Sequence, residues 1–140
     1  MSCKGIFYIC RMNQRFPYLF FHESDIHGLG VFTGAPIPKD TLLEVCPVIV
    51  LSTEDKKLIH QTHLHDYYFL WGEHNAQCAI ALGWGSLFNH SDTPNAIVEL
   101  NQIEKTLDIY SLRDIEAGEE IFIDYNGGED QENIVWFKPK

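Results

Sequence analysis

Basic side chains are scarce in this sequence. Its 140 residues include 10 lysines and arginines against 20 aspartates and glutamates, which gives a formal net charge of −10. Because a protein that grips nucleic-acid phosphates needs a basic surface, we expect no direct contact with nucleic acid. The acidic surplus has two interpretations. It attracts a substrate rich in lysine and arginine, or it only keeps the protein in solution.

Paired cysteines and long apolar runs are missing as well. The four cysteines stand at positions 3, 10, 46 and 78, with no Cys-x-x-Cys pair. This spacing argues against a zinc site and a disulfide framework, and it favours a reducing compartment. No stretch approaches the roughly 20 apolar residues of a membrane helix, and the apolar run near the start is too short for a signal peptide. We therefore expect a soluble protein without a membrane partner. It would be cytoplasmic, or nuclear if its source is a eukaryote or a virus in its host.

Short apolar segments separated by turns fill most of the chain. The strand-like segments include 18–21, 41–50, 67–71, 96–100, 106–112 and 120–124. One short helix is expected after Ser52 or Thr53, whose hydroxyl groups suit a helix N-cap. Many short strands with little helix predict a mostly-β domain with a minor α component. We place this single domain at residues 17–137, after an extension or added edge strand at 1–16 and before a tail at 138–140.

Two segments carry side chains suited to binding and chemistry. Residues 89–95 read Asn-His-Ser-Asp-Thr-Pro-Asn, and they place amides, an imidazole and hydroxyls on irregular backbone that a ligand can reach. About thirty residues later, an alternating strand ends at Tyr125. A local turn around a core histidine would also explain the first segment. A third segment, the glycine-bracketed turn at 27–30, is by itself typical of any tight turn.

Taken together, three segments resemble the SET-domain protein lysine methyltransferases. They are 27–32 (His-Gly-Leu-Gly-Val-Phe), 85–95 (Gly-Ser-Leu-Phe-Asn-His-Ser-Asp-Thr-Pro-Asn) and 115–125 (Ile-Glu-Ala-Gly-Glu-Glu-Ile-Phe-Ile-Asp-Tyr). They follow the order of the family, and the resemblance spans about residues 18–136. It is closest to the minimal viral and bacterial SET proteins. It implies a SET fold of small, mostly antiparallel sheets (β-clip type) with a C-terminal pseudoknot, which brings the second and third segments together.

The resemblance implies an enzyme that methylates protein lysine side chains. Its cofactor would be S-adenosylmethionine, and S-adenosylhomocysteine would be the product. Gly28, Leu29 and Gly30 would meet the methionine part of the cofactor through their main-chain groups. Glycine suits this position because a β-carbon would obstruct a close approach of the backbone.

Three further residues would bind the cofactor by the same resemblance. Asn89 would hydrogen-bond its charged amino-acid end, and the backbone of His90 would pair with the adenine edge. The imidazole of His90 would then be a structural anchor rather than a general base. Trp136, or its neighbour Phe137, would stack on the adenine. Alternatively, Trp136 only seals the core.

Tyr125 matches the catalytic tyrosine of the family, and Tyr67 is assigned as a second catalytic residue. A phenol with a pKa near 10 stays protonated at neutral pH, so we expect Tyr125 to orient the methyl group and the amine rather than to act as a base. Tyr67, Tyr110, Phe122 and Tyr125 would line a substrate channel. A dry channel beside a cation favours the neutral lysine amine. A plain core role for Tyr67 stays open.

Several alternatives remain at this stage. The substrate would be a histone tail or another Lys-rich protein, and a homodimer is possible. Where many family members carry cysteine this chain has Asp92, and it lacks their zinc-binding tail, so we expect no metal. A second hypothesis is a SET-like module that binds a basic peptide without catalysis. A third is a zinc or nickel site at His60, His63 and His65 with Asp66.

Overall fold

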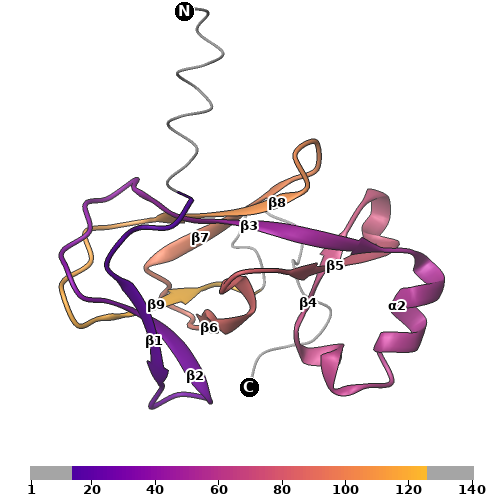
Figure 1. The fold of residues 1–140 in the computed structure, drawn as a ribbon, viewed down its shortest axis with the longest axis horizontal. Coiled ribbons are helices and arrows are strands. Elements are labelled where there is room, and N and C mark those ends of the chain that lie inside the picture. The colour runs from indigo at the N-terminus through magenta and orange to yellow at the C-terminus, as the bar shows by residue number, and fades with distance from the viewer. Residues whose placement is uncertain (1–13, 126–140) are drawn as a thin grey trace, which may run out of the picture.

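The computed structural model describes residues 14–125, which fold into two small β-sheets (Figure 1). The four-stranded sheet has the order β1 (Leu19–Glu23), β2 (Leu29–Thr33), β9 (Glu120–Ile123), β6 (Asn89–His90). The five-stranded sheet has the order β4 (Tyr68–Trp71), β5 (Gln77–Ala81), β3 (Leu42–Leu51), β8 (Thr106–Ser111), β7 (Ala96–Asn101). The prediction of a mostly-β domain built from small, mostly antiparallel sheets is confirmed.

Helical structure in the described range is confined to short pieces. They are α2 (Thr53–Ile59) and the 3-10 helices η1 (His63–Asp66), η2 (Glu73–Asn75) and η3 (Gly85–Leu87). Ser52 is the N-cap of α2, and its hydroxyl accepts a hydrogen bond from the backbone N–H of Asp55 at 3.1 Å. An N-cap hydroxyl satisfies one of the donors that a helix start leaves unpaired. No helix in residues 14–125 is long and apolar enough to cross a membrane.

The core lies where the two sheets share apolar side chains. Val31 on β2 and Ile121 on β9 are fully buried, as are Leu43 on β3 and Leu107 on β8, and all four belong to one cluster. Removing such side chains from water is the main favourable term in folding. The position of the four-stranded sheet is therefore fixed by the same core that holds the five-stranded one.

Strand β3 changes partners at Pro47. Its first part, up to Pro47, pairs with β8, and its last four residues, from Val48, pair with β5. Beside its first part, Arg15 forms an isolated antiparallel bridge with Glu44. Arg15 belongs to the 1–16 segment. Around Arg15, the described end of this segment lies against β3.

Strand β9 decides where the functional segments meet. It lies between β2 and β6, antiparallel to the first and parallel to the second. Asn89 pairs with Phe122 and His90 with Ile123 in the parallel ladder. Segments near positions 30, 90 and 120 thereby become neighbours in one sheet, as the labels β2, β6 and β9 in Figure 1 show.

Candidate active site

Asn89 links all three of the sequence segments described above. Its side chain is buried, with only 8% of the residue exposed. The Nδ2 atom donates to the backbone carbonyl oxygens of His27 at 3.0 Å and Leu29 at 3.2 Å. It also donates to Oε1 of Glu120 at 2.9 Å. One amide thus joins the glycine turn, the 85–95 segment and the last strand.

The two glycines of the turn are required for different reasons. Gly28 has a φ of +51°, which L-residues with a β-carbon rarely adopt, while a β-carbon there would meet no other atom of the described chain within 4 Å. At Gly30, an added β-carbon would stand so close to Oε1 of Glu120 that the carboxylate would have to move away from its present position. The expectation that both glycines let the backbone approach a ligand closely stays a prediction. Gly30 clears space for the carboxylate of Glu120, and Gly28 supplies the backbone conformation.

The imidazole of His90 is held on both sides. Its Nδ1 atom accepts a hydrogen bond from the backbone N–H of Tyr125 at 3.1 Å, and its Nε2 atom lies 3.1 Å from Oδ1 of Asp92. A neutral ring with its proton on Nε2 satisfies both contacts. This arrangement agrees with an anchoring role for the ring, which stays a prediction.

Tyr125 forms hydrogen bonds with Phe88 and His90, the residues on either side of Asn89 in the sequence. Its hydroxyl donates to the carbonyl oxygen of Phe88 at 2.6 Å, and its backbone N–H donates to His90. Burial, and to a lesser extent the nearby Tyr67, raises the pKa of Tyr125 to about 12. The phenol is therefore protonated at neutral pH. Its hydrogen bonds to Phe88 and His90 place Tyr125 beside Asn89 rather than on another face of the molecule.

Tyr67 and Phe122 lie near this group, whereas Tyr110 belongs to the other sheet. Tyr67 is 45% exposed, at the end of η1, and its carbonyl oxygen accepts from the hydroxyl of Ser86 at 3.2 Å. Phe122 is the β9 partner of Asn89. Tyr110 stands on β8, between β3 and β7. Trp136 lies outside the described residues. The channel assignments for these side chains stay predictions.

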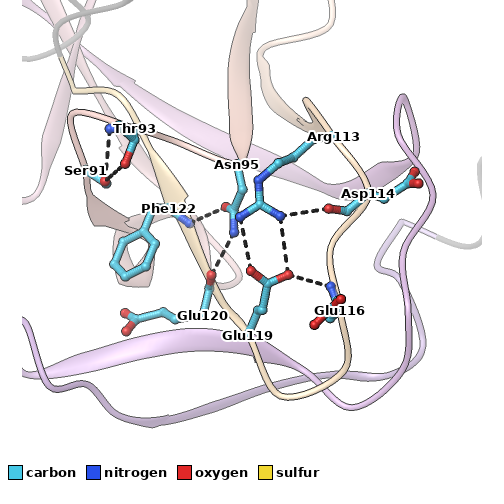
Figure 2. Close-up of polar contacts among 9 residues, drawn as sticks. All are labelled: Ser91, Thr93, Asn95, Arg113, Asp114, Glu116, Glu119, Glu120 and Phe122. Carbon is cyan, nitrogen blue, oxygen red and sulfur yellow. Dashed lines mark hydrogen bonds and ion pairs between the residues drawn. The ribbon is translucent and has the colours of Figure 1, made fainter.

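Two side chains in this group carry structural roles that the sequence interpretation did not assign. Asn95 is 2% exposed, and Figure 2 shows its amide between two strand residues. Its Nδ2 atom donates to the carbonyl oxygen of Glu120 at 2.9 Å, and its Oδ1 atom accepts from the N–H of Phe122 at 2.7 Å. The side chain of Asn95 thereby forms hydrogen bonds with backbone groups of β9. The second of these side chains is Glu120. Its carboxylate accepts a hydrogen bond from Asn89 and occupies the space beside Gly30.

The histidine-rich segment does not form a metal site in the described chain. Among residues 14–125, no group of three or more His, Cys, Asp or Glu side chains is arranged to hold a metal ion. Instead, Nδ1 of His60 lies 2.9 Å from the hydroxyl of Tyr68, and Nδ1 of His65 lies 2.6 Å from the carbonyl oxygen of Thr62. The zinc or nickel hypothesis therefore has no support in the geometry.

Comparison with known families decides how this arrangement is classified. A profile described as SET domain matches residues 28–126, which is more than half of the chain and includes all three segments except His27. The chain belongs to the SET-domain family. The adjacency of the three segments in this SET domain is the relationship that the sequence resemblance implied.

Similar proteins are histone-lysine methyltransferases by name. One from Schizosaccharomyces pombe, named as specific for lysine 37 of histone H3, is 35% identical over 121 residues, covering 86% of this chain and 77% of that protein. A second from the same organism, named for lysine 4 of H3, is 30% identical but is matched over only 14% of its length. The solved structure of a Plasmodium falciparum protein described as a histone methyltransferase aligns with a TM-score of 0.64 at 30% identity, over 81% of this chain and 97% of that one.

Proposed function

We propose that this SET-domain lysine methyltransferase moves a methyl group from S-adenosylmethionine to a lysine amine of a histone or another Lys-rich protein. The observation that carries the proposal is the position of Tyr125. Its two hydrogen bonds, to Phe88 and His90, hold it against the segment whose amide, Asn89, is bonded to the glycine turn. Asn89, which we assign to cofactor binding, and Tyr125, which we assign to catalysis, thus lie next to each other.

The residues around Asn89 and the glycine turn offer hydrogen-bond acceptors and open backbone that suit the proposed cofactor. The carbonyl oxygens of His27 and Leu29 accept hydrogen bonds from the amide of Asn89, and the second lone pair of each suits the ammonium group of an amino acid. Gly28 leaves its outer side open among the described atoms. When bound, S-adenosylmethionine would supply a methyl group already activated by its sulfonium. We assign residues 28–30, Asn89 and the backbone of His90 to holding it.

The chain's own contribution would be to position the amine and to exclude water. Burial keeps the phenol of Tyr125 neutral because its pKa is raised to about 12, so it can donate or accept a hydrogen bond without adding charge. A largely dry site disfavours the ammonium form of an entering lysine. Holding two reactants in line accelerates a transfer by removing the entropic cost of their encounter.

The substrate class follows from charge and from the named relatives. A net charge of −10 attracts a Lys-rich segment. The relative named for lysine 37 of H3 is matched over most of its length. A peptide of H3 around that lysine is therefore the first substrate to test, followed by one around lysine 4.

The decisive experiment is mass spectrometry of a lysine-peptide library, including both H3 peptides, after incubation with S-adenosylmethionine. Calorimetry with the cofactor alone accompanies it. We expect cofactor binding and a mass gain of one or more methyl groups on a lysine. Cofactor binding without any methylated peptide would favour a peptide-binding module, and absent cofactor binding would overturn the proposal.

A further inference from the structure

The carboxylate of Glu120 joins two segments that lie far apart in the sequence. Its Oε1 atom accepts from the amide of Asn89 at 2.9 Å, and its Oε2 atom accepts from the hydroxyl of Ser24 at 2.9 Å. Ser24 precedes the residues that the SET-domain profile matches. A carboxylate offers only acceptors when ionised, and its hydrogen bonds are stronger than those between neutral groups.

Ser24 in turn closes the loop that leads to the glycine turn. Its backbone N–H donates to the carbonyl oxygen of Gly28 at 2.8 Å, and its hydroxyl oxygen accepts from the N–H of Ile26 at 3.0 Å. The same hydroxyl therefore receives one hydrogen bond from the loop and donates another to Glu120. One side chain thus contributes both to the conformation of the loop and to its attachment to β9.

The glycine turn is fixed against the same carboxylate from its other end. A β-carbon on Gly30 would collide with Oε1 of Glu120, so the carboxylate packs directly against the backbone there. Asn89, bonded to this carboxylate, also donates to Leu29. Residues 24–30 are thus held by Glu120 at Ser24, at Gly30 and through Asn89.

We infer that Ser24 and Glu120 are positioning residues, which hold residues 24–30 in the conformation that binds the methyl donor. The inference rests on the proposed function, and it adds two residues outside the set assigned to direct cofactor contact. They act through the loop and through Asn89. Their loss therefore affects how tightly the donor binds more than how fast a fully bound complex turns over.

The neighbouring residue, Glu119, provides a matched control. Its carboxylate points to the opposite side of the chain from that of Glu120, toward Arg113 and the N–H of Glu116 (Figure 2). The Arg113–Glu119 pair closes the turn before β9, away from residues 24–30. Glu119→Gln removes one negative charge one residue from Glu120, so it separates a general charge effect from the specific contact.

The experiment compares Ser24→Ala, Ser24→Thr, Glu120→Gln and Glu119→Gln with the unaltered protein. Hydrogen exchange of the backbone in residues 24–30 is measured without cofactor, and calorimetry gives the Kd for S-adenosylmethionine. We expect faster exchange and a Kd raised about tenfold in Ser24→Ala and Glu120→Gln. Ser24→Ala loses its hydrogen bond to the carboxylate, and Glu120→Gln replaces one of two charged acceptor oxygens with an amide donor. Ser24→Thr keeps the hydroxyl and should restore both values, and Glu119→Gln should leave them unchanged.

Steady-state kinetics then separate positioning from a direct part in the chemistry. The KM for the cofactor should rise with the Kd in Ser24→Ala, while kcat at saturating cofactor stays within about twofold. The double variant Ser24→Ala/Glu120→Gln should cost little more than Glu120→Gln alone, since the contact that Ser24→Ala removes is one of those that Glu120 makes.

The failures of the inference and of the proposed function are distinguishable. If the unaltered protein binds S-adenosylmethionine but Ser24→Ala and Glu120→Gln behave like Glu119→Gln in exchange and in affinity, the inference is overturned. If the unaltered protein does not bind the cofactor, the proposed function fails. Slower or unchanged exchange of residues 24–30 in Ser24→Ala would refute the loop-holding role whatever the cofactor does.

Discussion

The hydroxyl of Tyr125 donates a 2.6 Å hydrogen bond to the carbonyl oxygen of Phe88, a residue that is almost fully buried. The contact joins positions 37 residues apart in the sequence. It fixes the direction of the phenol and places it next to Asn89. A phenol held in this way has a defined orientation before any ligand arrives, which is the property a positioning group in catalysis needs.

Replacing Tyr125 with phenylalanine tests this arrangement. We expect the fold to persist with a loss of about 1 kcal/mol of stability, because the Phe88 carbonyl loses its donor. The Kd for S-adenosylmethionine should change little, whereas kcat on a lysine peptide should fall about a hundredfold, as misplaced reacting groups do. Thermal unfolding, calorimetry and peptide methylation measure the three quantities. Unchanged turnover in this variant would remove Tyr125 from the mechanism.

Replacing Asn89 with alanine should produce the opposite pattern. The amide that binds the carbonyl oxygens of His27 and Leu29 is lost, so the glycine turn is no longer tied to the second segment. We expect the Kd for S-adenosylmethionine to rise at least tenfold, measured by calorimetry at a temperature where circular dichroism shows an intact fold. Asn101→Ala, at the distant β7–β8 turn, is the control. An affinity equal to that of the control would exclude Asn89 from cofactor binding.

Stability should fall in alkaline solution through two buried tyrosines. Burial raises the pKa of Tyr125 and of Tyr68 to about 12 each, with smaller effects from Tyr67 and Cys78 respectively, against an ordinary value near 10. The folded state then binds more protons than the unfolded state between about pH 10 and 12. The stability that these two phenols contribute is fully maintained below pH 10 and decreases as the pH rises toward 12, by about 1.4 kcal/mol per unit of pKa shift. Burial also raises the pKa of the Cys46 and Cys78 thiols above their ordinary value of 9.0, so these groups add a loss that begins near pH 9.

Urea unfolding at a series of pH values from 8 to about 11 measures this decrease. The variant Tyr68→Phe should show a shallower decline than the unaltered protein, since one of the two shifted phenols is gone. Its hydroxyl contact with His60 is also lost, so its stability at pH 8 is the reference for that variant. Equal slopes in the two proteins would show that Tyr68 does not titrate with a raised pKa.

The ion pair between Arg15 and Glu44 should contribute more stability than the one between Arg113 and Glu119. Only 3% of the Glu44 side chain is exposed, and the Arg15 guanidinium also stacks 3.7 Å from the ring centre of Trp84. Arg15→Ala would leave a buried carboxylate without its cation, which costs roughly 3 kcal/mol. Arg113→Ala breaks a more exposed pair and should cost under about 1 kcal/mol.

Urea unfolding of both alanine variants at neutral pH makes this comparison. It also tests the proposed domain limits, because Arg15 lies in the segment 1–16 that we separated from the SET domain. A large loss in Arg15→Ala would show that the end of this segment is part of the folded unit. Equal losses in the two variants would mean that the burial of Glu44 does not matter.

Local patterns in the sequence were enough to find most elements. The cap at Ser52 and the strand-like segments at 41–50, 96–100 and 106–112 depend on neighbouring residues, and the structure has α2, β3 and the β7–β8 pair at these places. The change of partner at Pro47 is only partly local. Proline lacks a backbone N–H, but which strand pairs on each side depends on the whole sheet.

The site could be predicted only as far as its segments could be recognised. Asn89 and Tyr125 stood out because they occur in short motifs, and family resemblance brought these motifs together. Glu120 and Ser24 were assigned no role. Glu120 lies in the third segment, but nothing in that segment names the partner of its carboxylate, and Ser24 precedes the glycine turn without a motif of its own. Their hydrogen bond spans 96 positions, and no local periodicity encodes a contact at that separation.

The amino-acid sequence by itself determined that the chain forms short strands and carries an acidic surplus, because each of these follows from composition or from adjacent residues. The grouping of the three segments followed from the family resemblance of their motifs. Only the tertiary structure decided that Gly30 accommodates the carboxylate of Glu120, and that Asn89 lies against the tyrosine at the end of β9. The physical reason is that the parallel pairing of β6 with β9 sets the register of distant side chains. A strand's own sequence fixes which face each residue occupies, but not which partner it meets.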